Sequence, residues 1–148
     1  MKFVLIESAN TAVKFSSDVA EAISGYYAGA EVTIKTSATD YDIPFHASSL
    51  LGADRVFVFV THSRDPISMN KVNMVLSKLI DLEVANRKQV YKIAALVEGD
   101  LGEGEVAAIK KEVTEYCMKL LAGESPSSEV VGHVPSEPSP GVFDFFKT

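Results

Sequence analysis

The chain of 148 residues has little of several features that would define a class of function. It has one cysteine, Cys117, so no internal disulfide bond can form. One cysteine and three scattered histidines argue against a structural zinc site, which needs a full set of nitrogen and sulfur ligands. Basic residues are outnumbered, 14 against 20 acidic ones, and the net charge is −6. We therefore expect neither general nucleic-acid binding nor docking on an anionic membrane.

Long apolar runs are also missing. No stretch of about 18 apolar residues exists, so no membrane-spanning segment is predicted. The short apolar run at residues 3–6 lacks a small-residue cleavage site behind it, which favours a strand over a signal peptide. We expect a cytoplasmic protein in which Cys117 is a buried structural thiol, the alternative being a reactive one.

Strand and helix patterns alternate along the chain. Runs rich in β-branched and aromatic residues predict strands at 2–7, 30–35, 55–61 and 89–97. Apolar spacings of three and four predict helices near 15–26, 45–51, 68–85 and 106–120, with Ser68 as the cap of the third. This order predicts a three-layer α/β/α domain with a four-stranded parallel sheet. Right-handed crossovers favour the flavodoxin-like strand order 2-1-3-4.

The composition changes after Gly123. Residues 1–123 are predicted to form the single α/β domain, and residues 124–148 a Pro/Ser-rich C-terminal arm without a core of its own. The arm ends in an apolar, aromatic segment at residues 142–146, which includes Phe143, Phe145 and Phe146. We expect this end to dock on a neighbouring subunit or on the protein's own surface. The alternative is a frayed terminus.

Polar residues follow all four predicted strands. In a parallel sheet of this order, ligands bind beyond the carboxyl ends of the strands, here at the gap between the first and third. The candidate site residues at that edge are Ser8, Asn10, Lys14, Thr39, Asp42, His62, Arg64 and Glu98. Their hydroxyls, cations and carboxylates suit a polar, hydroxylated or phosphorylated small molecule. A glycine-rich phosphate loop is absent, so the sequence does not support nucleotide binding.

Each candidate also has a simpler interpretation. Ser8 and Asn10, with Thr11, are ordinary caps for the first helix. Arg64 has loop carboxylates to pair with. His62 is the only candidate suited to proton transfer near neutral pH, and a loop histidine is otherwise simply solvated.

One motif resembles a known family. Lys35-Thr36, five residues and then Asp42-Ile43-Pro44 resemble the second-strand exit of the lumazine synthase superfamily. The closer likeness is to its archaeal-type riboflavin synthase branch, which carries Lys-Thr, five residues and Asp-Leu-Pro. The short helix, Val/Phe-rich strand, polar turn and long helix that follow agree in order, and the resemblance covers about residues 1–122. Two family elements differ, because Ala38-Thr39 replaces a Pro-Gly pair and Val75-Leu76 replaces a His-Glu pair.

The resemblance implies an activity in riboflavin biosynthesis. A transferase of this kind moves a four-carbon unit between two molecules of 6,7-dimethyl-8-ribityllumazine and needs no cofactor or metal. Asp42 would contact the ribityl chain, and His62 would be the acid and base. Arg64, the second catalytic candidate, and Lys14 would contact an anion or the ring. The resemblance also implies a homo-oligomer, a pentameric ring with sites between subunits. The differing elements leave open a non-catalytic oligomeric relative that binds a flavin- or lumazine-like ligand.

Overall fold

The computed structural model describes residues 1–123 and, for the backbone alone, residues 142–145. Strands and helices alternate there as the hydrophobic pattern predicts. The strands are β1 (Lys2–Ser8), β2 (Glu31–Ser37), β3 (Arg55–His62), β4 (Tyr91–Leu96) and β5 (Val142–Phe145). The helices are α1 (Ser16–Tyr26), α2 (Ile43–Ser49), α3 (Pro66–Asn86) and α4 (Glu103–Leu121), and a short 3₁₀ turn, η1 (Asp40–Asp42), precedes α2.

The predicted parallel sheet with order 2-1-3-4 is confirmed, and a fifth strand extends it. The full order is β2-β1-β3-β4-β5, with every neighbouring pair parallel. β5 comes from the end of the expected C-terminal arm, and its backbone pairs with β4 of the same chain, Lys92 opposite Val142. The expected linker at residues 124–141, the side chains of Phe143 and Phe145, and all of Phe146 lie outside the described residues.

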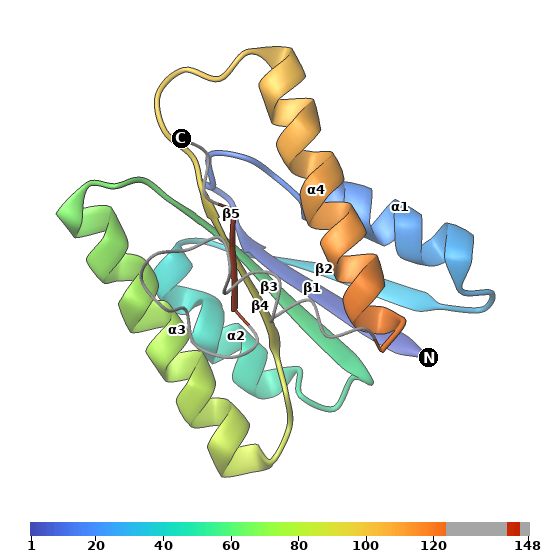
Figure 1. Cartoon of the computed structure of the whole chain (residues 1–148). Helices are drawn as coiled ribbons and strands as arrows, with labels where there is room; N and C mark the ends of the chain where they lie inside the picture. The colour runs from blue at the N-terminus through green and yellow to red at the C-terminus, as the bar shows by residue number, and fades with distance from the viewer. Residues whose placement is uncertain (124–141, 146–148) are drawn as a thin grey trace.

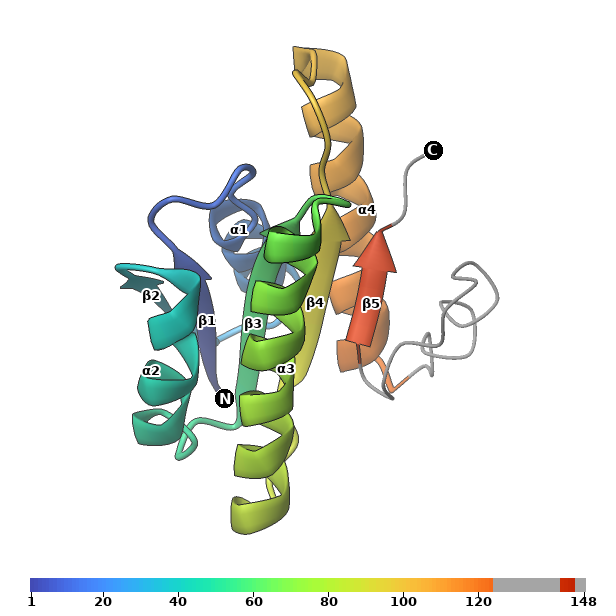
Figure 2. The same ribbon diagram turned by 90° about the vertical axis from the view of Figure 1, so that its left-hand side faces the viewer.

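Two helix layers cover the sheet. Figure 1 shows α1 and α4 on one face and α2 and α3 on the other, which is the predicted three-layer α/β/α arrangement. In the turned view of Figure 2, the strand arrows of β3, β4 and β5 point the same way, and β2 and β5 lie at opposite edges. The carboxyl ends of the strands therefore meet at one edge of the sheet.

The central strands owe their position to sequence. Phe3–Ser8 of β1 and Val56–His62 of β3 are buried on both faces, as expected of near-continuous apolar runs in a parallel sheet. β2 carries β-branched residues between and beside the charged Glu31 and Lys35, and all of it except Val32 and Ser37 is exposed. A strand with so little apolar surface is stable at an edge.

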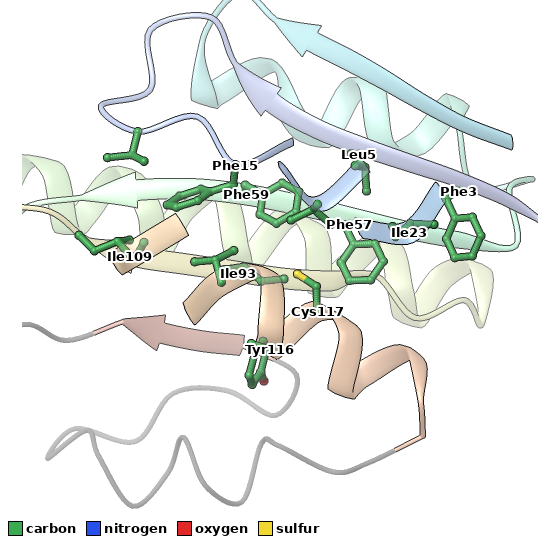
Figure 3. Close-up of a cluster of buried hydrophobic side chains, with 14 residues drawn as sticks. Phe3, Leu5, Phe15, Ile23, Phe57, Phe59, Ile93, Ile109, Tyr116 and Cys117 are labelled. Carbon is green, nitrogen blue, oxygen red and sulfur yellow. The ribbon is translucent and has the colours of Figure 1, made fainter. Parts of the chain in front are cut away.

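The core has two halves, one on each face of the sheet. The half under α1 and α4 contains an aromatic group in which the rings of Phe57 and Phe59 are parallel, with centroids 6.2 Å apart (Figure 3). Cys117 lies in this half with no exposed surface, and burial raises the pKa of its thiol. The prediction of a buried structural thiol is therefore confirmed. Val58, Val75 and Leu79 belong to the half under α2 and α3.

The start of α3 differs from the prediction. The helix begins at Pro66, and the cap is Asp65, whose carboxylate accepts the Ile67 N–H at 3.3 Å. Proline suits the first turn because its missing N–H would have no helical partner there. Ser68 lies inside the helix, and its hydroxyl accepts the backbone N–H of Ser63 at 3.0 Å. Ser68 therefore fixes the turn after β3 instead of capping the helix.

Candidate functional site

Buried polar side chains are concentrated at the carboxyl edge of the sheet. Among the described residues, eight polar or charged side chains are buried. Seven of them lie at the carboxyl ends of β1, β2 and β3 or in the first turns that follow: Glu7, Ser8, Ser16, Ser37, Asp40, Thr61 and His62. Burying a polar group costs free energy unless it is hydrogen-bonded. A cluster of such groups at the edge where α/β proteins bind ligands marks this edge as the candidate site.

Glu7 joins the end of β1 to the start of α1. Its two carboxylate oxygens accept the backbone N–H groups of Phe15 at 2.9 Å and Ser16 at 3.2 Å. These groups have no partner within the helix, and the positive end of the helix dipole favours a carboxylate. The prediction that Ser8, Asn10 and Thr11 cap this helix is therefore wrong, because Glu7 of β1 accepts the N–H groups at the helix start instead.

The predicted site residues of the first loop are held close to the backbone. The hydroxyl of Ser8 is hydrogen-bonded to the side-chain oxygen of Asn10. The backbone N–H of Asn10 donates to Ser8 Oγ at 3.1 Å. The ammonium group of Lys14 donates to the carbonyl of Ala9 at 3.0 Å. The N–H of Ala9 donates in turn to the carbonyl of Ser37 at 2.7 Å. The loop after β1 is thereby attached to the end of β2.

A pair of threonines crosses the gap between β1 and β3, where the ligand is predicted to bind. The hydroxyls of Thr11 and Thr61 lie 2.9 Å apart, and the N–H of Ala12 donates to Thr61 Oγ1 at 3.2 Å. Thr61 is buried near the end of β3, and Thr11 is half-buried in the loop after β1. Two hydroxyls that bond each other can exchange that bond for a hydroxylated ligand without leaving a group unpaired.

Thr39 and Asp42, both predicted site residues, form one unit at the exit of β2. Thr39 Oγ1 donates to Asp42 Oδ2 at 3.0 Å, and the carbonyl of Thr39 accepts the hydroxyl of Ser37 at 2.6 Å. Asp42 is exposed. The threonine bond orients one carboxylate oxygen, and the exposed carboxylate can accept a further hydroxyl donor from a ligand.

Asp40 is the residue at this edge that sequence reasoning passed over in favour of Asp42. It is 6% exposed, its Oδ2 lies 2.8 Å from Lys71 Nζ on α3, and its Oδ1 has no hydrogen-bond partner among the described residues. The only sequence signal was its place in the same acidic turn. A buried carboxylate oxygen without a donor is costly, and because Oδ1 is itself enclosed, a ligand can reach this acceptor only if the turn around Asp40 moves.

The third and fourth loops hold the remaining candidates. His62 is the last residue of β3 and is 8% exposed, with Nδ1 3.4 Å from the carbonyl of Ser63. The backbone N–H of Arg64 donates to Glu98 Oε1 at 2.8 Å, and its guanidinium lies 3.9 Å from Glu98 Oε2. Arg64 therefore pairs with a loop carboxylate, the simpler of the two interpretations of this residue. Its role in a reaction stays a prediction.

A hollow of about 470 Å³ adjoins this end of the site. It lies between the end of β4 and the first turns of α4, and its wall includes Leu96, Leu101 and Ile109 with the carboxylates of Glu98 and Glu105. The Glu105 side chain accepts the backbone N–H of Gly102 at 3.5 Å and so caps the start of α4. The lining of the hollow thus combines apolar side chains with two carboxylates, a composition typical of small-molecule sites.

The described contacts join the eight predicted residues into two groups. The first group lies at the ends of β1 and β2 or in the segments that follow them, which the bond between Ala9 and Ser37 links; it contains Ser8, Asn10, Lys14, Thr39 and Asp42. The second group, His62, Arg64 and Glu98, lies at the end of β3 or in the loops after β3 and β4, where the carbonyl of His62 accepts the N–H of Val97 at 2.8 Å. The Thr11–Thr61 bond connects the two sides.

The fold and this edge define an α/β domain of flavodoxin-like strand order with a polar site at its carboxyl edge. Comparison of the sequence with models of known families and with curated proteins gives no match. Within the described part of the chain, none of the helices is both long and apolar enough to cross a membrane. In the same residues, no three His, Cys, Asp or Glu side chains gather as potential metal ligands.

Proposed function

We propose that the protein binds a ribityllumazine or flavin-like molecule at the carboxyl edge of its sheet and transfers a four-carbon unit between two ribityllumazine molecules. The observation that carries the proposal is the concentration of buried polar groups at this edge, beside the Lys-Thr, five-residue, Asp-Ile-Pro motif. A ribityl chain is a row of hydroxyl groups, and carboxylates and threonines are suitable partners for it.

Asp42 and the threonines supply the binding part of this proposal. The Asp42 carboxylate, oriented by Thr39, accepts hydroxyl donors from the ribityl chain, and Thr11 and Thr61 exchange their mutual bond for bonds to the ligand. The Leu96, Leu101 and Ile109 wall of the adjoining hollow suits the flat apolar ring system.

His62 and Arg64 supply the chemical part. Transfer of the four-carbon unit needs protons moved at the ring methyl groups, and the imidazole of His62 is the group suited to that near neutral pH. The two rings must also be held in register, which lowers the entropic barrier of the reaction. The protein contributes positioning and proton transfer, and no redox cofactor enters the scheme.

A second candidate function is binding without turnover. The two residues proposed for the reaction favour it, because His62 is buried and Arg64 is paired with Glu98. A non-catalytic relative would keep the polar edge and lose the reaction. The two candidates share a ligand and differ only in whether riboflavin appears.

One titration followed by one incubation tests both candidates. Purified protein is titrated into 6,7-dimethyl-8-ribityllumazine while the ligand's fluorescence is followed, and the mixture is then assayed for riboflavin. Binding with riboflavin formation supports the transferase, and binding alone supports the second candidate. Absence of both rejects the proposal. D42A should weaken binding about 10-fold, the loss of roughly 1.4 kcal/mol, whereas D81A on the exposed face of α3 should not.

A further inference from the structure

We propose that two copies of this chain pair through β2, antiparallel and centred on Thr33, so that their sheets become one continuous sheet. β2 lies at the edge of the sheet, and within the described residues its only neighbouring strand is β1 (Figure 2). An edge strand carries unpaired backbone N–H and C=O groups, which form a template for another strand.

The backbone of β2 shows which residues face outward. The N–H of Glu31 donates to the carbonyl of Met1 at 3.0 Å, and the carbonyl of Ser37 accepts the N–H of Ala9 at 2.7 Å. Both ends of the strand therefore direct the backbone groups of odd-numbered residues toward β1 and its loop. In a parallel pair the direction alternates from residue to residue.

The even-numbered residues of β2 must then bond any new neighbour. Val32, Ile34 and Thr36 direct their N–H and C=O groups away from β1, toward the open edge. In an antiparallel pair, opposite residues either both exchange hydrogen bonds or both do not. In a symmetric pair of identical strands, one residue must therefore lie opposite its own copy across the two-fold axis, and only a few registers remain. Each register is defined by that residue, for example an axis at Thr33.

Charge selects one of these registers. Glu31 and Lys35 are exposed on the same face of β2, and neither has an ion partner among the described residues. With the axis at Thr33, Glu31 of each copy lies opposite Lys35 of the other. An axis at Glu31 or Lys35 places like charges opposite each other, and an axis at Val32 or Ile34 places each charge opposite an uncharged side chain. Opposite charges across a strand pair are stabilising and like charges are destabilising.

The other face of β2 agrees with the same register. Val32 and Ile34 are the apolar residues of the strand, and Ile34 is 45% exposed. With the axis at Thr33, Val32 of each copy exchanges both backbone hydrogen bonds with Ile34 of the other, and their side chains meet. Neither proline nor glycine interrupts β2, so the strand lacks the proline that would block a new neighbour. Its one lysine, Lys35, lies opposite Glu31 of the other copy in this register.

Native mass tests the pairing directly. At roughly 100 µM, where contacts of micromolar dissociation constant are populated, we expect light scattering to give twice the chain mass of 16.0 kDa. E31K or K35E should shift the protein toward monomer and weaken the dimer about 10-fold or more, since each places like charges opposite each other twice. E115K and K78E, which make the same charge changes on exposed helix positions, should leave the mass unchanged.

Mixing the single variants gives the sharpest test. In a mixed pair of E31K and K35E, both cross-strand contacts are again between opposite charges. Each variant alone should be monomeric and the mixture dimeric, and the double variant E31K/K35E should also dimerise. General damage to the fold cannot produce this restoration.

A backbone variant tests the hydrogen bonds independently of charge. I34P removes an outward N–H and leaves the β1 ladder in place, so it should give a monomer with unchanged circular dichroism. A monomeric wild type overturns the proposal, as does an odd-numbered ring such as the pentamer that the family resemblance implies. A dimer that survives E31K, K35E and I34P overturns it too. The ligand titration is independent, so failure here leaves the proposed function standing.

Discussion

Lys92 Nζ lies 2.5 Å from Glu83 Oε1, in an ion pair that joins β4 to the last turns of α3. Lys92 is 1% exposed and also donates to the carbonyl of Val90 at 2.9 Å. Glu83 Oε2 accepts the N–H of Val90 at 2.7 Å. This is the one buried polar cluster of the described residues that lies away from the carboxyl edge, so we assign it to stability.

Removal of one partner of this pair should be costly. We expect K92M to lower the free energy of unfolding by about 3–5 kcal/mol, because Glu83 keeps a charge with no ammonium group beside it. The double variant K92M/E83Q should lose clearly less than the sum of the single variants. Urea unfolding measures both. K78M on the exposed face of α3 is the control, and additive losses would contradict a coupled pair.

The negative charge of Glu7 should contribute to the stability of the fold. A glutamine at this position tests the charge alone, because it keeps the shape of the side chain. E7Q should lower the free energy of unfolding by about 1–2 kcal/mol, since the carboxylate accepts two N–H groups at the start of α1. The matched control is E21Q, which removes an exposed carboxylate from the same helix. Equal stability of E7Q and the wild type in urea would show that the helix start is satisfied without the charge.

Cys117 should be protected in the folded protein. It has no exposed surface, and burial raises the pKa of its thiol, so little reactive thiolate exists near neutral pH. We expect one thiol per chain to react with Ellman's reagent in concentrated urea and almost none in native buffer. Fast labelling in native buffer, at a rate that does not follow unfolding, would show that the thiol is accessible.

Asp54 should contribute to the stability of the fold in a way that depends on pH. Its carboxylate accepts the backbone N–H of Lys2 at 2.6 Å, and this bond holds the pKa of Asp54 below its ordinary value. A depressed folded-state pKa means that the stabilisation is present above the pH at which a free aspartate titrates. It is lost as pH falls through the lowered value.

The comparison of the wild type with D54N across pH tests this sign. The wild type should unfold at a higher temperature near neutral pH, and the difference should shrink as the solution is acidified. A difference that stays constant down to acid pH would show that the carboxylate charge is not responsible. D100N, in an exposed loop, should show no pH-dependent difference.

The framework of the fold could be predicted because apolar runs and helical spacing are local signals. The runs that form β1 and β3 and the four helix patterns place every layer of residues 1–123 in order. β5 was not predicted as a strand, because its residues form an apolar run too short to distinguish a strand from another docked conformation. Its pairing depends on a partner, β4, that is distant in sequence.

The candidate site was less predictable, because the direction of a side chain in a turn depends on tertiary contacts. Asp40 and Asp42 stand in one 3₁₀ turn, yet Asp40 is buried against Lys71 and Asp42 is exposed. The capping role of Glu7 was also hidden, since a carboxylate at the end of a strand reaches the helix only once the loop has closed. Sequence identified the edge and, of its seven buried polar residues, selected only Ser8 and His62, and it did not give these orientations.

The pairing of β5 with β4 has a consequence for synthesis. During translation, residues 91–96 leave the ribosome well before residues 142–145, so a nascent chain that has already assembled β1 to β4 still lacks the strand beside β4. Domains begin to fold from the N-terminal side as they emerge, at about 5–20 residues per second. The time for which that flank of the nascent sheet stays open is therefore set by the speed of translation and not by the stability of the finished protein.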